Sequence, residues 1–212
     1  MPTSCLLKPS ILEHRLQQLS SFCHPKVNLE QYTTSAHIAS QLLTEIQQNH
    51  GDIEDCIIAD LGCGAGILTA GAALLGAAHC VGFEIDEEAL EVYLKNMEKL
   101  DLVNCEAIQC DILQTKSWDR WQNSFDTVIT NPPFGTREQG ADLEFLKVGL
   151  QLADVVYSLH KTSTRKFVLK KAKEGGYTSI VLAQLKFDLP KSYVFHSKKS
   201  VDIYVDLIRS QK

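Results

Sequence analysis

The sequence predicts an α/β fold: a seven-stranded, mostly parallel sheet with an antiparallel last strand and helices on both faces. Two patterns lead to this fold class. From residue 56 onward, short continuous apolar runs alternate with helical segments, which is typical of parallel strands covered on both sides. The last two apolar runs, residues 177–189 and 200–209, have no convincing helix between them. Strands joined in this way are expected to run antiparallel, because a parallel connection needs a longer crossover.

The chain length favours one domain. With 212 residues and 44% apolar content, the chain can bury one substantial core but is short for two. We expect a single domain over residues 1–212, composed of an N-terminal helical extension (1–50) and a seven-strand α/β core (51–212). No apolar run reaches the roughly 18 residues of a membrane span, and the N-terminus lacks a signal pattern. A soluble intracellular protein with no membrane partner is expected.

Two helices are predicted in the extension. Residues 10–13, SILE, have the spacing of a capping box, and leucines at helical spacing follow them. The second helix is predicted from Ser35 to Asn49, with an apolar face and with Gly51 just past its end.

The core elements alternate between strand and helix. The predicted strands cover residues 56–61, 78–85, 105–112, 125–131, 154–160, 177–189 and 200–209. The predicted helices cover residues 67–76, 87–100, 141–153 and 163–176. In open sheets of this kind, ligands bind beyond the carboxyl ends of the central strands. The loops after the first four strands are therefore the expected site.

Cysteine usage and charge narrow the function classes. Seven cysteines lie within residues 1–110 and form no C-x-x-C pair, so we expect buried thiols rather than a disulfide framework or a metal centre. The net charge is −5, but residues 1–155 carry −13 and residues 156–200 carry +8. A basic zone on an acidic body can steer a polyanion to one face, although charge alone fits a solvated helix face equally well.

The loop after the first core strand reads ADLGCGAGI, residues 59–67. Its glycines allow left-handed backbone angles and the close approach of a ligand. A dinucleotide fingerprint is not met, because Ile67 stands where the third glycine is required, and no triphosphate-binding lysine follows. Asp60, before the loop, suits a ligand with an ammonium group. The D-x-G-x-G-x-G spacing resembles motif I of the class I methyltransferases, Rossmann-like enzymes that use S-adenosyl-L-methionine.

Two further carboxylates follow the next two strands. Glu84 can accept hydrogen bonds from ribose hydroxyls, and Asp111 can accept one from an adenine amino group while the Ile112 N–H faces a ring nitrogen. Aspartate is commoner than glutamate at the first position in similar methyltransferases, so Asp86 is a second candidate for the ribose. The cofactor-binding residues predicted from the three loops are Asp60, Gly62, Gly64, Ala65, Gly66, Ile67, Glu84, Asp111 and Ile112.

The fourth strand runs into NPPF, which resembles the [DNS]-P-P-[YFW] motif of methyltransferases that act on planar amino nitrogens. The Asn131 side-chain oxygen and the Pro132 carbonyl can accept the two hydrogens of such an amino group. Pro132 and Pro133 restrict the backbone that aims them. Phe134 offers a face for stacking of a flipped base. These four residues are the predicted catalytic residues.

Across nearly every element from Leu29 onward, the chain resembles the methyltransferase-like 5 family of small-subunit (18S) ribosomal RNA N6-adenine methyltransferases. The stretches that carry the match are LEQYTTSAHIA, IADLGCGAGIL, CVGFEIDEEALE, QCDI, NPPFGT, VYSLHK, DLP with YVFHSKKSVDI, and VDLIR. The resemblance implies in-line methyl transfer from S-adenosyl-L-methionine to N6 of a flipped-out adenosine of 18S rRNA. It also implies that Gln31 and Thr34 contact the cofactor.

The resemblance further implies a heterodimer with a small zinc-binding methyltransferase activator protein, which adds a strand beside an exposed sheet edge. It places the protein in the nucleus (nucleolus) and the cytoplasm. The basic residues that it makes candidates for rRNA backbone contacts are Lys161, Arg165, Lys166, Lys170, Lys171 and the stretch HSKKS.

Two alternatives to an rRNA methyltransferase stay open at this point. The second possibility is an enzyme that uses the same NPPF corner to methylate glutamine side chains of a protein, or adenine or cytosine in DNA. A non-catalytic subunit that keeps the fold is the third possibility, although such subunits usually lose the glycine loop or the NPP corner, and this chain retains both.

Overall fold

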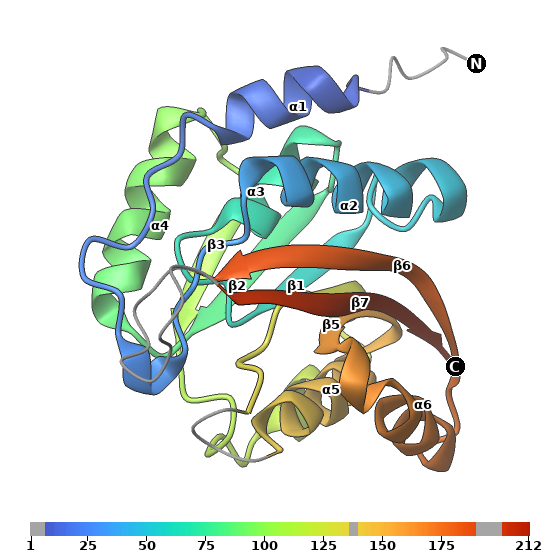
Figure 1. The fold of residues 1–212 in the computed structure, drawn as a ribbon. Coiled ribbons are helices and arrows are strands. Elements are labelled where there is room, and N and C mark those ends of the chain that lie inside the picture. Colours follow the sequence, from blue (N-terminus) through green and yellow to red (C-terminus); the bar gives the residue numbers. More distant parts are fainter. Residues whose placement is uncertain (1–6, 136–139, 190–200) are drawn as a thin grey trace.

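The computed structural model describes residues 7–135, 140–189 and 201–212. The strands are β1 (Ile57–Leu61), β2 (His79–Glu84), β3 (Cys105–Gln109), β4 (Phe125–Thr130), β5 (Ala153–Lys161), β6 (Thr178–Leu189) and β7 (Val201–Gln211). They form one seven-stranded sheet in the order β3-β2-β1-β4-β5-β7-β6 (Figure 1). Neighbouring strands are parallel except that β7 runs antiparallel to β5 and β6. The predicted α/β class and the antiparallel last strand are confirmed.

Helices cover both faces of this sheet (Figure 1). They are α1 (Pro9–Leu16), α2 (Ala36–His50), α3 (Ile67–Leu74), α4 (Glu87–Lys99), α5 (Ala141–Leu152) and α6 (Arg165–Glu174), with short 3-10 helices η1 (Val27–Leu29), η2 (Trp118–Trp121) and η3 (Thr162–Thr164). One core cluster joins α1 to α4 with the sheet, and a second joins α5, α6 and η2 with the opposite face. No helix of the described ranges is long and apolar enough to cross a membrane.

The two N-terminal helices form where they are predicted, but one cap differs. Helix α1 begins at Pro9 and its N-cap makes no side-chain hydrogen bond, so the capping box expected at residues 10–13 is wrong. Proline at the first helical position has its φ already fixed and lacks the N–H that a cap would satisfy. In α2 the predicted limits hold: Ser35 Oγ accepts the Ile38 N–H, and Gly51 ends the helix at a φ of +69°.

The N-terminal extension packs directly on the α/β core. Leu12 of α1 and Leu43 of α2 are fully buried in the same cluster as Ile58 of β1. Helix α3 approaches α2 closely at Gly71, where a Cβ would lie 2.3 Å from Leu43 Cδ1. Extension and core therefore share one hydrophobic cluster within the described residues.

The topology places two loops side by side. From β1 the chain proceeds outward to β2 and β3, and β4 then lies on the other side of β1. The carboxyl ends of β1 and β4 therefore meet where the strand order reverses, which is the usual ligand-binding position in an open α/β sheet. The glycine loop follows β1 and the NPPF corner follows β4. β3 is shorter than predicted, so Asp111 lies in the turn beyond it.

Candidate active site

Two cavities, of about 370 Å³ and about 40 Å³, lie beyond the carboxyl ends of the central strands. Of the predicted site residues, the larger cavity is lined by Gln31, Gly62, Gly64, Glu84, Asp111, Ile112, Asn131 and Pro133. The smaller cavity adds Thr34, Asp60, Ala65 and Ile67. Gly66, Pro132 and Phe134 line neither of these two cavities. The structure thus brings residues of four loops and of the N-terminal segment together.

The glycine loop needs its glycines for conformation and for space. Gly62, Gly64 and Gly66 have φ values of +72°, +54° and +85°, in the left-handed region. At Gly66, the N-cap of α3, a Cβ would lie 2.5 Å from the ring of Tyr93. At Gly64 it would lie 2.7 Å from the ring of Phe22, which packs over the loop from the N-terminal segment. A larger residue at Gly64 or Gly66 would therefore clash with an aromatic ring packed against the loop.

One carboxylate oxygen of Asp60 is hydrogen-bonded to the first turn of α3, and the other is available to a ligand. Its Oδ2 accepts the Thr69 N–H at 3.1 Å and the Thr69 hydroxyl at 2.6 Å. Its Oδ1 is buried and has no hydrogen-bond partner among the described residues. Burial raises the pKa of Asp60 to about 7, although the Thr69 hydrogen bonds oppose the shift. A cationic group in the smaller cavity, which Asp60 lines, would satisfy Oδ1 and favour the charged carboxylate.

Glu84 also faces the larger cavity. Its Oε1 accepts the N–H groups of Ile85 and Asp86, both at 3.0 Å, and its Oε2 accepts the Gly64 N–H at 2.9 Å. Burial raises its pKa, while these backbone donors act in the opposite direction. Oε2 accepts one hydrogen bond from the described residues and the side chain lines the cavity, so Glu84 can still accept a hydrogen bond from a ligand hydroxyl.

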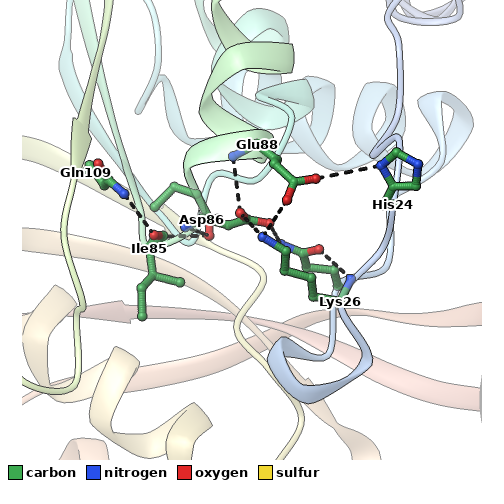
Figure 2. A network of polar contacts seen from close by, with 8 residues as sticks. His24, Lys26, Ile85, Asp86, Glu88 and Gln109 are labelled. Carbon is green, nitrogen blue, oxygen red and sulfur yellow. Dashed lines mark hydrogen bonds and ion pairs between the residues drawn. The ribbon is translucent and has the colours of Figure 1, made fainter.

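Asp86, the alternative ribose ligand, is engaged elsewhere. It lines neither cavity, and Figure 2 shows it within a polar network that ties the N-terminal segment to the end of β2. Its Oδ1 lies 2.6 Å from Lys26 Nζ, and its Oδ2 accepts Gln31 Nε2 at 2.6 Å. Desolvation raises the pKa of Asp86, but hydrogen bonds from Lys26 and Gln31 outweigh it and lower the pKa overall. The geometry therefore favours Glu84 over Asp86 for a ligand in the cavity.

Residues 22–34, here called the strap, cross the mouth of the site. Gln31 is fixed at both ends of its amide, because its Oε1 also accepts the Lys26 N–H at 2.7 Å. The predicted contact of Gln31 with the cofactor remains a prediction, with the side chain in the cavity wall.

The turn after β3 is held by Asp111. Its Oδ1 accepts the N–H groups of Leu113 at 2.9 Å and of Gln114 at 3.3 Å. The carbonyl of Ile112 accepts Trp118 Nε1, which anchors the turn on the second core cluster. Both Asp111 and Ile112 line the larger cavity, and their contact with an adenine stays a prediction.

Asn131 is the residue of the NPPF corner with a defined polar orientation. Its Nδ2 donates to Thr34 Oγ1 at 2.8 Å. Its Oδ1 is buried and has no hydrogen-bond partner in the described part of the chain. Thr34 thus turns the amide so that a lone acceptor faces the cavity that both residues line. An unpaired buried acceptor is costly, which makes it a strong candidate for a substrate contact.

The aromatic part of the corner is paired with the strap. The Phe134 ring stacks on Tyr32 with centroids 5.0 Å apart and planes inclined by 24°. The Tyr32 hydroxyl donates to the Pro132 carbonyl at 3.0 Å. Phe187 meets Phe134 edge-on at 6.3 Å, and Lys161 Nζ lies 6.0 Å from its centroid.

Several cavity residues were not predicted. The unpredicted lining residues of the larger cavity are Phe22, Asn28, Leu29, Glu30, Tyr32, Ile85, Cys110, Leu113, Ala141 and Phe145. The residues of the strap could not be predicted from the sequence pattern, because they contact parts of the chain more than 30 residues away, and hydrophobic periodicity reports only neighbours within one element.

The basic residues that are candidates for rRNA contacts differ in exposure and in ion pairing. Arg165 is bound by buried Asp206 at 2.6 and 2.7 Å, so its charge is neutralised. Lys166 and Lys170 are exposed on α6, and both Lys170 and Lys171 pair with Glu174, at 3.8 and 2.7 Å. The HSKKS stretch, residues 196–200, lies outside the described residues. No group of three or more potential metal ligands occurs in the described ranges.

The comparisons with known proteins identify the family and the fold. The family described as "Methyltransferase domain" matches residues 53–200. A crystal structure of a candidate RNA methyltransferase from Pyrococcus horikoshii superposes with a TM-score of 0.85 at 36% identity, and the match covers 98% of both chains. The sheet order, the glycine loop and the acidic strand ends define a class I methyltransferase, a fold and family that imply S-adenosyl-L-methionine as the cofactor.

Two full-length relatives specify the family. The Danio rerio protein named rRNA N(6)-adenosine-methyltransferase METTL5 is 50% identical over 205 residues, 96% of this chain and 98% of its own. The Drosophila melanogaster Mettl5 protein is 46% identical over 205 residues, 96% of each chain. The chain belongs to the METTL5 family of rRNA N(6)-adenosine-methyltransferases, and it is an enzyme rather than a non-catalytic subunit.

Proposed function

We propose that this enzyme methylates the exocyclic N6 amino group of a specific adenosine in small-subunit (18S) ribosomal RNA. The observation that carries the proposal is the buried Oδ1 of Asn131, which has no hydrogen-bond partner among the described residues and is oriented by Thr34 at the carboxyl end of β4. An amino group with two hydrogens is the kind of ligand that needs such an acceptor.

The corner can activate a poor nucleophile. The lone pair of an adenine amino nitrogen is delocalised into the ring, which flattens the group. Asn131 Oδ1 and the Pro132 carbonyl can accept its two hydrogens and favour a pyramidal nitrogen, whose lone pair then points out of the ring plane. The flipped base is expected to stack on Phe134, which contributes about 1–3 kcal/mol.

Bound S-adenosyl-L-methionine supplies a methyl group that is already activated on a sulfonium. No side-chain base is needed while the nitrogen attacks in line, and the proton can leave afterwards. The protein's contribution is therefore mainly orientation, which can lower a barrier by about 7–11 kcal/mol.

The residues present fit this cofactor. Asp60 Oδ1, unpartnered within the described residues, suits an ammonium group. Glu84 suits ribose hydroxyls, and Asp111 with the Ile112 N–H suits an adenine, since all three line the larger cavity.

Ribosomal RNA as the substrate is supported by the names of the relatives and by a basic surface. The Danio rerio and Drosophila melanogaster relatives are both named as rRNA N(6)-adenosine-methyltransferases. Exposed Lys166 and Lys170 lie on α6, which η3 joins to β5, and the carboxyl end of β5 lies beside the NPPF corner. Lysines can contact phosphates without reading sequence.

We also propose the heterodimer with the zinc-binding activator, and we place its docking surface at β3. This strand is the outermost of the sheet, so one of its edges has no strand beside it among the described residues. Leu94 on α4 and Val103 before β3 are 59% and 97% exposed. An open strand edge flanked by exposed apolar side chains favours strand addition by a partner. Nucleolar and cytoplasmic location is proposed with it, and fluorescence imaging of the tagged chain tests it.

The test of the activity is methyl transfer from labelled S-adenosyl-L-methionine to isolated small-subunit RNA, followed by mass spectrometry of the nucleosides. We expect N6-methyladenosine. DNA oligonucleotides and total ribosomal protein serve as parallel substrates. N4-methylcytidine, methylated DNA or methylglutamine as the main product would show that the same corner serves a different acceptor.

A further inference from the structure

Tyr32 makes the two contacts that the proposed function reserves for the substrate base. Its hydroxyl donates to the Pro132 carbonyl at 3.0 Å, the acceptor assigned to an N6 hydrogen. Its ring stacks on Phe134, the face assigned to the adenine ring. A phenol that reaches both positions at once imitates an adenine, since both combine a flat apolar ring with a donor at its edge.

The stack leaves no room for a base. The Tyr32 and Phe134 centroids are 5.0 Å apart. A base inserted between two rings needs about 7 Å, twice the contact distance of about 3.5 Å between carbon atoms. A base that stacks on this face of Phe134 must therefore displace the Tyr32 ring.

The Tyr32 side of Phe134 is also the side that faces the cofactor-binding residues. Tyr32 and Asn131 line both cavities, together with Gly62 and Gly64 of the glycine loop. Phe187 and Lys161, which meet Phe134 elsewhere, line neither cavity. An amino group held by Asn131 Oδ1 must lie on the cavity side, and this is where the Tyr32 ring lies.

We propose that Tyr32 is a residue of the acceptor site that holds the place of the adenine when RNA is absent and is displaced by it. The inference rests on the proposed adenosine N6 activity. The neighbouring Gln31 is anchored by Asp86 at 2.6 Å and by the Lys26 N–H at 2.7 Å. With the backbone anchored there, displacement is a rotation of the Tyr32 side chain rather than a release of the strap.

Displacement has a cost that every acceptor must meet. The base has to replace the hydrogen bond to the Pro132 carbonyl and the stack on Phe134 before it gains its own contacts. An RNA with contacts elsewhere on the protein can supply this free energy from those contacts, as binding energy from non-reacting parts of a substrate commonly does. The tyrosine also covers Phe134 and satisfies the Pro132 carbonyl while no substrate is bound.

The test is Tyr32→Phe, which keeps the ring and removes the hydroxyl. Loss of a neutral hydrogen bond should ease displacement roughly two- to tenfold. We expect the KM for small-subunit RNA to fall by that factor, with kcat changed less than twofold and cofactor affinity unchanged. Tyr177→Phe is the matched control, because the Tyr177 hydroxyl also donates to a backbone carbonyl, that of Leu150, beside the amino end of β5.

The outcomes separate this inference from the proposed function. If the wild-type enzyme makes no N6-methyladenosine, the proposed function is wrong. If it does, but Tyr32→Phe leaves the KM unchanged or raises it, Tyr32 is not displaced by the base. A fall in kcat at constant KM would also overturn the inference, because the hydroxyl would then act on the reaction itself.

A second measurement uses the wild-type sequence. With fluorotyrosine incorporated, the resonance missing from the Tyr32→Phe spectrum identifies Tyr32. We expect it to shift when RNA and S-adenosyl-homocysteine are both added, because the ring leaves Phe134. A resonance that stays in place under saturating RNA would contradict displacement.

Discussion

Asn131 shows how one side chain can be both anchored and ready for a ligand. The Asn131 Nδ2 donates to Thr34 Oγ1 at 2.8 Å, while the Asn131 Oδ1 is buried and has no partner among the described residues. The anchoring hydrogen bond fixes which atom faces the cavity. The proposed reaction depends on that orientation.

Asn131→Ala removes this acceptor and leaves the glycine loop and the acidic residues in place. We expect methyl transfer to fall by roughly 10²–10³, the usual effect of losing one oriented polar group at a reacting centre. Binding of S-adenosyl-L-methionine, measured by calorimetry, should stay within about twofold. Asn104→Ala is the control, because Asn104 lies at the amino end of β3 and donates to Ala77. Loss of cofactor binding together with activity, or activity that survives, would contradict the assigned role.

Asp60 carries a prediction about pH. Its pKa of about 7 lies above the ordinary 3.8 because the carboxyl is buried, so below pH 7 the free enzyme holds it mostly protonated. A bound ammonium group favours the charged form and lowers the pKa again. Cofactor binding should therefore release up to one proton near pH 6 and none from this group at pH 8.

Calorimetry at pH 6 in two buffers of different ionisation enthalpy measures this proton release. Asp60→Asn should abolish the part that comes from Asp60. If the variant and the wild type release equal numbers of protons, Asp60 does not meet the charged group of the cofactor.

At the scale of elements, the strap is the part of the site least supported by secondary structure. It contains only η1 (Val27–Leu29) and is fixed to the end of β2 through Asp86. Asp86 is almost fully buried, whereas the Lys26 side chain is 36% exposed. Because Lys26 stays open to solvent, the pair stabilises the strap less than a fully buried pair would.

Asp86→Asn removes the charge that holds Lys26. We expect faster hydrogen exchange in residues 22–34 and weaker cofactor binding, because the strap forms one wall of the larger cavity. Glu88→Gln is the control: Glu88 also meets Lys26, at 3.1 Å, but is 55% exposed and should matter little. Unchanged exchange in Asp86→Asn would mean that the strap is held by its apolar contacts alone.

The strap also marks the limit of what the sequence predicts. The strands and the NPPF corner could be predicted because apolar runs, glycines and prolines act locally. The QYTT stretch indicates only the entry to a helix, yet Tyr32 meets Pro132, 100 residues away. The choice between Glu84 and Asp86 was equally open in the sequence, because it depends on Lys26 and Gln31. The capping box failed because Pro9 starts the helix without a cap.

For the whole molecule, the two proposed surfaces lie toward opposite ends of the sheet. β3 is the outermost strand at one end, and α6 packs on β5 and β6 toward the other (Figure 1). The central strands between them carry the site. A protein partner at β3 and an RNA on α6 would therefore not compete for space.

The last prediction concerns the β3 edge. Co-expression with the zinc-binding activator should raise the soluble yield sharply, because exposed apolar side chains beside an open strand edge favour aggregation.

Val103→Glu should weaken the heterodimer at least tenfold without destabilising the free chain, since Val103 is 97% exposed. The matched control is Ile180→Glu, at an exposed apolar position on β6 at the other edge. Co-purification and calorimetry measure both variants. An equally soluble and active monomer would contradict the heterodimer, whereas a complex weakened by Ile180→Glu and not by Val103→Glu would move the partner to the β6 edge.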